Sequence, residues 1–199
     1  MINQFRLLVK LFCYSFIVAS LNGCQVTTSN QILPELTFQH LTSLNLNVAK
    51  LEITHSYNQP MATPYVEHLF HTPPAVALDR WARDRLHPMG SSGFAHFTII
   101  EASVTETKLD KQKDIMSLFT KNQSEQYDAI LEAKLEIFSD NGRRRGFAKA
   151  KATRSMTVRE DSSINKRNQE WFKLTEELIR DINVELERNI MKYLFKWII

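Results

Sequence analysis

The feature that most constrains the fold is an alternation of apolar and polar side chains on both sides of a turn. The apolar positions before the turn are Tyr127, Ala129, Leu131, Ala133, Leu135 and Ile137. Asp140-Asn141-Gly142 then supplies residues that favour the positive φ angles of a hairpin turn. The apolar positions after the turn are Ala148, Ala150, Ala152, Met156 and Val158. Since a two-residue period is that of a strand with one buried face, the pattern predicts a long antiparallel hairpin.

The residues from Asn165 to Trp197 have a different period and predict one long amphipathic helix. Their apolar positions recur every three or four residues: Trp171, Leu174, Leu178, Ile182, Leu186, Ile190, Tyr193 and Trp197. Such a helix is about 45 Å long, and a strand of about 13 residues is nearly as long. The helix is therefore expected to lie along the hairpin, where the alanines permit close approach.

The remaining elements complete an α+β pattern. From Leu44 to Thr54, apolar and polar residues alternate, but the alternation shifts by one position after Val48. This shift predicts a strand with a bulge or with two buried faces. A short helix is expected from Leu78 to Leu86 and a second strand from 93 to 107. The predicted order is β-α-β-β-β-α. It makes a two-layer sandwich, in which a mostly antiparallel four-stranded sheet has a short and a long helix on one face.

The first 24 residues predict export. Residues 1–23 contain Arg6 and Lys10, no acidic residue, and an apolar run from 11 to 21, which is the layout of a secretory signal peptide. The run is shorter than the roughly 20 residues that span a bilayer. Leu21-Asn22-Gly23-Cys24 resembles the bacterial lipobox, in which the cysteine is lipidated and becomes the first residue of the mature chain. The alternatives are a cleaved signal peptide with an incidental cysteine and an uncleaved membrane anchor.

The lipobox resemblance has consequences for location. Acyl chains on Cys24 would give stable anchoring. An Asp after the cysteine marks inner-membrane retention in lipoproteins of this kind, whereas this chain has Gln25. We therefore expect attachment to the outer membrane with the domain facing the periplasm, the inner membrane being the alternative.

Composition indicates one domain behind a tether. Residues 24–39 are polar at their start and have no clear period, so they are expected to form the lipidated tether. Residues 40–199 contain no second linker and are expected to form a single domain. Losing Arg6 and Lys10 leaves 23 of 25 basic residues against 22 acidic ones, so the net charge falls from +3 to +1. This near-neutral balance argues against a nucleic-acid partner.

Catalytic motifs are missing from the sequence: it has no GxGxxG, P-loop, GxSxG or HExxH pattern. We predict no catalytic residue and no cofactor. His68 and His71 have a spacing that a metal could use, but no third ligand lies nearby, and zinc takes three or four. No metal site is therefore predicted. His96 is expected to be a sheet residue with a hydrogen-bond partner.

Three acids are candidates for a general acid/base pair: Asp79 and Asp84 on the short helix, and Glu101 on a strand. Asp79 and Asp84 are five positions apart, so they do not share a helix face. We favour surface charges and one strand carboxylate over a catalytic pair.

Two further segments have both a binding and a structural interpretation. Arg143, Arg144 and Arg145 follow the hairpin turn directly. They form either an anion site for phosphate groups of lipid or lipopolysaccharide or a solvated tip that discourages aggregation, and the second interpretation is favoured. Residues 191–199 are amphipathic and aromatic. They contact a bilayer or a partner, or fold onto their own sheet, which is the favoured interpretation.

Three parts of the chain carry a family resemblance: Trp81 to Leu109, the segment from Ser117 to Asp128 (SLFTKNQSEQYD), and the final helix. Together they resemble an uncharacterised family of bacterial, mainly alphaproteobacterial, envelope lipoproteins. The order of elements is also similar to that of the ABC-transport auxiliary lipoproteins and of the lipopolysaccharide-assembly lipoprotein that plugs an outer-membrane barrel. The resemblance implies a non-enzymatic accessory role, and it carries over no site residue.

These observations predict a non-catalytic outer-membrane lipoprotein that acts as an accessory or assembly subunit of a cell-envelope complex. The alternative is a lipid- or lipopolysaccharide-binding periplasmic module. An envelope hydrolase is a third hypothesis, and it requires the three acids to converge. The expected partners are the membrane, through lipid on Cys24, an envelope protein and an anionic lipid.

Overall fold

The computed structural model describes residues 33–109 and 124–199. The signal peptide predicted for 1–23 and the lipidation of Cys24 lie outside the described residues. In the last part of the predicted tether, Leu36 and Phe38 are 9% and 8% exposed and belong to the core. Packing against the domain therefore begins before residue 40.

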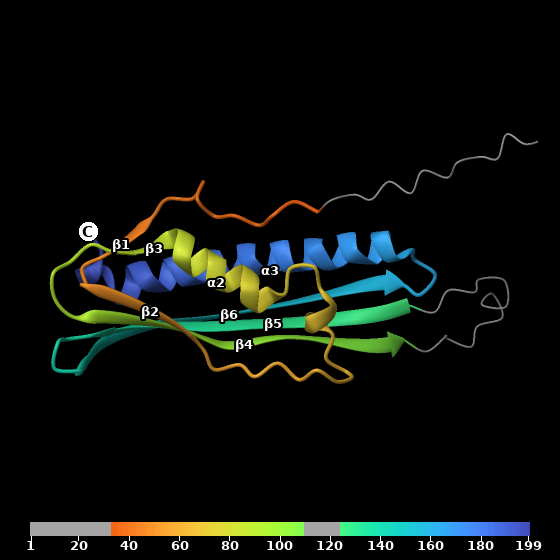
Figure 1. Ribbon diagram of the computed structural model, residues 1–199, viewed down its shortest axis with the longest axis horizontal. Coiled ribbons are helices and arrows are strands. Elements are labelled where there is room, and N and C mark those ends of the chain that lie inside the picture. The colour runs from red at the N-terminus through yellow and green to blue at the C-terminus, as the bar shows by residue number, and fades with distance from the viewer. Residues whose placement is uncertain (1–32, 110–123) are drawn as a thin grey trace, which may run out of the picture. The chain divides into compact units, whose positions relative to one another are not determined.

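The main sheet has four strands in the order β2-β4-β5-β6 (Figure 1). Their bounds are Lys50–His55 for β2, Phe94–Leu109 for β4, Ser124–Phe138 for β5 and Arg144–Arg159 for β6. The β4–β5 and β5–β6 pairs are antiparallel, whereas β2 is parallel to the first part of β4. The mostly antiparallel four-stranded sheet is confirmed.

The alternation in β5 and β6 defines the buried face of the hairpin. Leu135 lies opposite Ala148, and Ala133 opposite Ala150. These side chains are buried, and the intervening residues are exposed or half-buried except for Glu136. The predicted hairpin is therefore present and extends by a few residues at each end.

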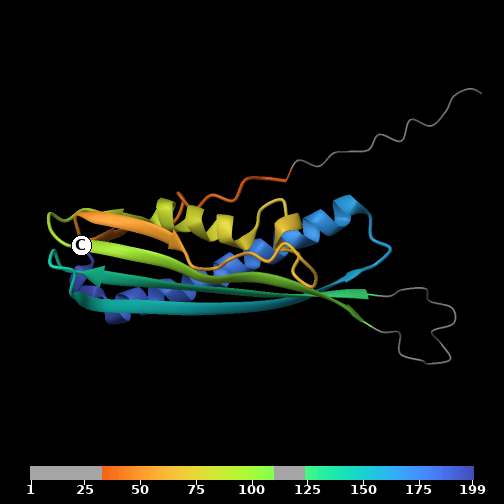
Figure 2. The same ribbon diagram turned by 60° about the horizontal axis from the view of Figure 1, so that its bottom comes forward.

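Two helices cover one face of this sheet (Figures 1 and 2). Helix α2 (Pro74–Arg85) packs over β4, and α3 (Ile164–Tyr193) lies along β6 and β5. Ser163 caps α3, because its Oγ accepts a hydrogen bond from the backbone N–H of Lys166 at 3.2 Å. The side chains of α3 buried against the sheet and α2 include Trp171, Leu174, Leu178, Ile182, Leu186 and Ile190. The predicted two-layer α+β sandwich is confirmed.

The strand predicted from Leu44 to Thr54 is two strands in two sheets, so that expectation was wrong. Strand β1 (Leu44–Leu46) pairs in parallel with β3 (Leu86–Pro88), whereas β2 joins the main sheet. The backbone N–H of Gly90 donates to the carbonyl of Val48 at 2.9 Å in the connection between β1 and β2. The change of alternation phase therefore marks a change of sheet and not a bulge.

The C-terminal segment folds back onto β1, as favoured from the sequence. After α3, a 3-10 turn (Phe195–Trp197) leads to Ile198, which forms an antiparallel bridge with Leu46. The carbonyl of Trp197 accepts a hydrogen bond from the N–H of Asn47 at 2.8 Å. In the described part of the chain, no helix is both long and apolar enough to cross a membrane.

Candidate anion site at the hairpin end

The turn between β5 and β6 separates the three arginines that are consecutive in the sequence. Phe138 pairs with Arg144 and Ile137 with Gly146, so Arg145 is an extra residue in the ladder. Such a bulge redirects the side chain that it carries. The run of three arginines is therefore not a single cluster with one environment.

Arg144 already has an anionic partner. Its Nη1 donates to Oε1 of Glu136 at 3.0 Å, and its guanidinium lies 5.3 Å from the centre of the Phe147 ring. Burial raises the pKa of Glu136, but Lys134 and Arg144 lower it more, so the net pKa is below the usual range. Glu136 is therefore ionised, and its negative charge compensates the positive charge of Arg144.

Arg145 instead lines a hollow of about 350 Å³ where the hairpin, the turn before β4 and the C-terminal segment meet. The lining residues that matter for binding are Asn47, Ser92, Asp140, Arg145, Lys196 and Trp197. The structure therefore brings the arginine tip and the aromatic C-terminal segment together, although Lys196 is 51 positions after Arg145 in the sequence.

Two glycines shape the walls of this hollow. Gly93 has a φ of 73°, and a Cβ there would lie 2.5 Å from the carbonyl oxygen of Phe138. Its N–H donates to Oδ1 of Asp140 at 2.6 Å, which links the turn before β4 to the hairpin. At Gly146 a Cβ would lie 3.2 Å from Cζ3 of Trp197, so the missing side chain makes room for the indole.

The hollow contains donors without partners. Arg145 and Lys196 have exposed side chains, and neither forms an ion pair with any residue that the structure describes. The Lys196 ammonium lies 5.8 Å from the centre of the Phe195 ring. Among the described residues that line this hollow, Asp140 is the one acidic residue. Two cations against one anion leave the hollow positively charged.

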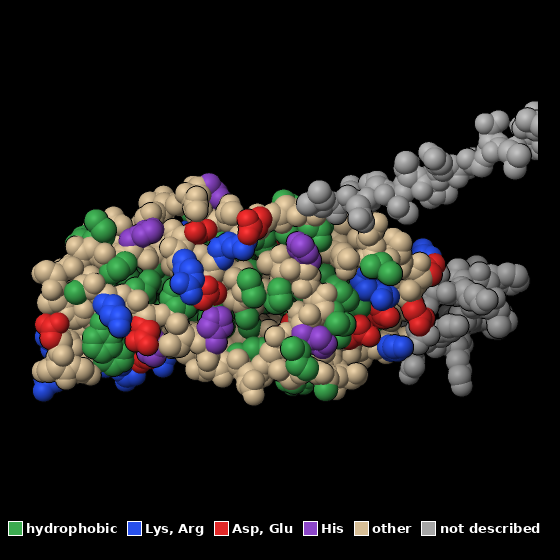
Figure 3. All heavy atoms as spheres, viewed as in Figure 1, with side chains coloured by type: hydrophobic (Ala, Val, Ile, Leu, Met, Phe, Trp, Pro, Cys, Tyr) green, Lys and Arg blue, Asp and Glu red, His purple; other side chains and the backbone are tan. Residues whose placement is uncertain are grey.

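The positive hollow is a local feature. On the face drawn in Figure 3, Lys and Arg side chains are interspersed with Asp and Glu side chains. Those charges form no broad field of one sign on that face. On this face, therefore, the charges do not favour long-range attraction of an anion.

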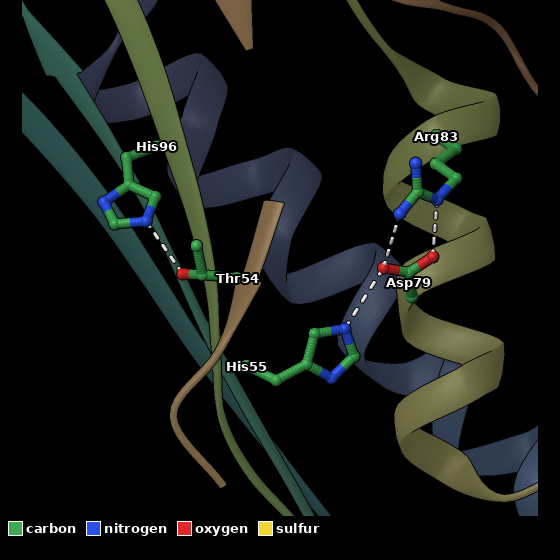
Figure 4. Close-up of polar contacts among 5 residues, drawn as sticks. All are labelled: Thr54, His55, Asp79, Arg83 and His96. Atoms are coloured by element: carbon green, nitrogen blue, oxygen red, sulfur yellow. Dashed lines mark hydrogen bonds and ion pairs between the residues drawn. The ribbon is translucent and has the colours of Figure 1, made fainter. Parts of the chain in front are cut away.

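The histidine predictions have different outcomes. His96 Nε2 lies 2.7 Å from Oγ1 of Thr54, which confirms it as a sheet residue with a hydrogen-bond partner (Figure 4). For His68 and His71, no group of three or more His, Cys, Asp or Glu that could hold a metal occurs in residues 33–109 and 124–199.

Each helix acid considered for catalysis has its own partner. Asp79 lies between His55, at 3.1 Å, and Arg83, whose Nε donates at 2.6 Å (Figure 4). Oδ2 of Asp84 accepts a hydrogen bond from the backbone N–H of Phe38 at 2.8 Å. Glu101 lies opposite Glu132 in the β4–β5 ladder. Within the described residues, these three acids have separate partners and do not form one cluster.

No family model and no curated protein matches the chain. Among solved structures, the chain is similar to a minor lipoprotein from Acinetobacter baumannii, whose crystal structure was determined at 2.35 Å. The alignment covers 73% of this chain and 92% of that chain, with 16% identity and a TM-score of 0.34. The resemblance to envelope lipoprotein families stays a prediction from the sequence.

Proposed function

We propose that this chain is a lipid-anchored, non-catalytic protein of the bacterial outer membrane. Lipid on Cys24 holds it to the membrane, and its domain faces the periplasm. There it acts as an accessory or assembly subunit of a cell-envelope complex. The observation that carries the proposal is Leu21-Asn22-Gly23-Cys24, placed directly after a basic start and a short apolar run.

The contacts of the acids support a non-catalytic role. A carboxyl group that acts as a general acid or base must be free to exchange a proton with a substrate. Asp79 is engaged by Arg83 and His55, and its pKa is lowered. Asp84 holds the backbone of Phe38 against α2. These carboxylates stabilise the fold, and the hydrolase hypothesis loses two of the residues on which it depends.

The test is purification of the native lipidated protein from detergent extracts after crosslinking in intact cells. A stoichiometric envelope protein that co-purifies supports the accessory role. Its recovery should fall in the Cys24→Ser variant, because loss of the anchor removes the protein from the membrane. Lipid without a protein partner would instead favour the lipid-binding alternative. Turnover of an envelope substrate by the purified protein would overturn the non-catalytic proposal.

A further inference from the structure

We propose that the hollow at the hairpin end binds a phosphate group. This inference goes beyond the accessory role and does not depend on the identity of a protein partner. The site consists of Arg145 and Lys196, with Ser92 and Asn47 on the same walls. The ligand class is a phosphate monoester, and the exposed Phe195 and Ile199, close to Lys196 in the sequence, favour one carried by a lipid headgroup.

Charge is the first argument. The lining of the hollow includes two cations, Arg145 and Lys196, and one anion, Asp140, so it has an excess of positive charge. Glu136 does not offset this excess, since its contacts are with Lys134 and Arg144. A phosphate monoester carries a charge of about −1.5 to −2 at pH 7, and its several oxygens let it pair with both cations at once.

Hydrogen-bond donors are the second argument. Four exposed side chains that line the hollow have N–H or O–H groups that form no hydrogen bond with another described residue: Asn47, Ser92, Arg145 and Lys196. A guanidinium offers a planar fork of donors and an ammonium a compact point charge. Several oxygens on one phosphorus can accept from such donors in different directions, whereas a carboxylate has two oxygens in one plane.

The hydroxyl of Ser139 does not belong to this set. Its Oγ donates to Oδ1 of Asn141 at 2.6 Å within the turn. Asp140 also lines the hollow, and its carboxylate opposes an incoming anion. Since its hydrogen bond from Gly93 needs only an acceptor oxygen, an asparagine at 140 can keep that bond without the charge.

The neighbouring apolar side chains favour a lipid as the source of the phosphate. Phe195 and Ile199 are 59% and 62% exposed, and they flank Lys196 and Trp197 in the sequence. Exposed aromatic and aliphatic side chains beside cations are suited to the boundary between headgroups and acyl chains. A soluble phosphate ester would use the same donors without contacting these side chains.

The experiment follows the three tryptophan indole N–H signals by NMR in the lipidated protein, held in micelles of a zwitterionic detergent. Inorganic phosphate is titrated in one series, and phosphatidic acid is added to the micelles in another, with phosphatidylcholine as its control. Trp197 lines the hollow, whereas Trp81 and Trp171 are buried in the core. We expect a saturable shift of the Trp197 signal alone.

Variants locate the site. Arg145→Gln and Lys196→Gln should each weaken phosphate binding on the order of tenfold, since each removes a charge-assisted hydrogen bond. Arg143→Gln is the matched control, because Arg143 is on the same turn but is not among the residues lining the hollow. Asp140→Asn should tighten binding. Unchanged Trp81 and Trp171 signals show that each variant is folded.

The outcomes separate the interpretations. A Trp197 signal that responds to neither phosphate nor phosphatidic acid overturns the site. Equal responses in wild type and in both Gln variants do the same. Binding of inorganic phosphate without any response to phosphatidic acid upholds the phosphate site and rejects the lipid source. None of these results depends on the partner purification that tests the accessory role.

Discussion

At the scale of single residues, Tyr127 shows how a polar group is held inside the sandwich. Its side chain is fully buried, and its ring meets that of Trp171 edge-on, with centres 5.6 Å apart. The hydroxyl lies 2.7 Å from Oε2 of Glu125 and 3.0 Å from Oε2 of Glu106. Burial raises the pKa of Tyr127, and the two carboxylates raise it further.

Replacing Tyr127 with Phe should therefore destabilise the domain. A hydrogen bond to a charged group contributes about 1.5 to 3 kcal/mol, and we expect a loss of unfolding free energy of about that size in urea melts at pH 7. Because the folded-state pKa is raised, this stabilisation is fully present below the unfolded pKa of about 10 and is lost as the pH rises above it. A gap between wild type and variant that widens above pH 10 would contradict this account.

The contribution of Asp79 to stability should have the opposite pH dependence. Burial raises its pKa, but hydrogen bonds from Arg83 and His55 lower it more, so its net pKa is below the ordinary value. The contribution of the carboxylate to stability is then present above the unfolded pKa and is lost as the pH falls through the folded one. Asp79→Asn should lower the melting temperature at pH 7.

The difference from wild type should narrow as the pH is reduced below about 4. Melting curves recorded across the acid range check this. A constant difference between wild type and Asp79→Asn down to acid unfolding would show that the carboxylate charge plays no part.

At the scale of elements, the periodicity of the sequence predicted the long strands and the long helix, because local sequence determines them. The alternation of apolar and polar residues continues along most of β5 and β6, and the helical period continues over several turns of α3. Both patterns are long enough to predict the element type. The parallel pairing of β2 with β4, and of β1 with β3, depends on contacts between distant segments. No local pattern reports those contacts.

The candidate site was predictable only in part, for the same reason. Arg145 stood out in a run of three arginines, whereas Lys196 lies 51 residues away in a segment singled out for its aromatic side chains. The bulge that directs Arg145 to the hollow has no sequence signal that distinguishes it from Arg143 and Arg144. Only the folded chain shows which arginine lines the hollow.

The packing of α3 on the hairpin gives a stability prediction. Leu178 is fully buried, and Ala150 is buried on the facing strand. Leu178→Ala should cost about 2 to 5 kcal/mol because it leaves a cavity. Ala150→Leu should cost about 1 to 3 kcal/mol because the larger side chain overpacks the layer.

A matched control lies on the same helix. Val184 is 57% exposed on α3, and Val184→Ala should change the unfolding free energy by less than about 0.5 kcal/mol. Denaturant melts of the three variants measure these values. Wild-type melts for both Leu178→Ala and Ala150→Leu would contradict the observed packing.

At the scale of the whole molecule, the proposed lipid anchor precedes the domain that contains the proposed phosphate site. The core of the described domain includes residues from Leu36 to Leu194. The segment from 33 to 39 is held by Arg80, whose guanidinium donates to the carbonyl of Leu36 and pairs with Glu35. If Cys24 is lipidated, eight residues (25–32) lie between it and the described part of the chain, so we expect the domain to lie close to the membrane surface.

The central claim is lipidation at Cys24, and metabolic labelling with a fatty acid followed by membrane fractionation tests it most directly. Wild type should incorporate the label, begin at an acylated Cys24 by mass spectrometry and fractionate with the outer membrane. Cys13→Ser, which changes the only other cysteine, should behave in the same way. Cys24→Ser should remain unlabelled and uncleaved by the lipoprotein peptidase. Label incorporation and outer-membrane fractionation in Cys24→Ser at the wild-type level would contradict the account.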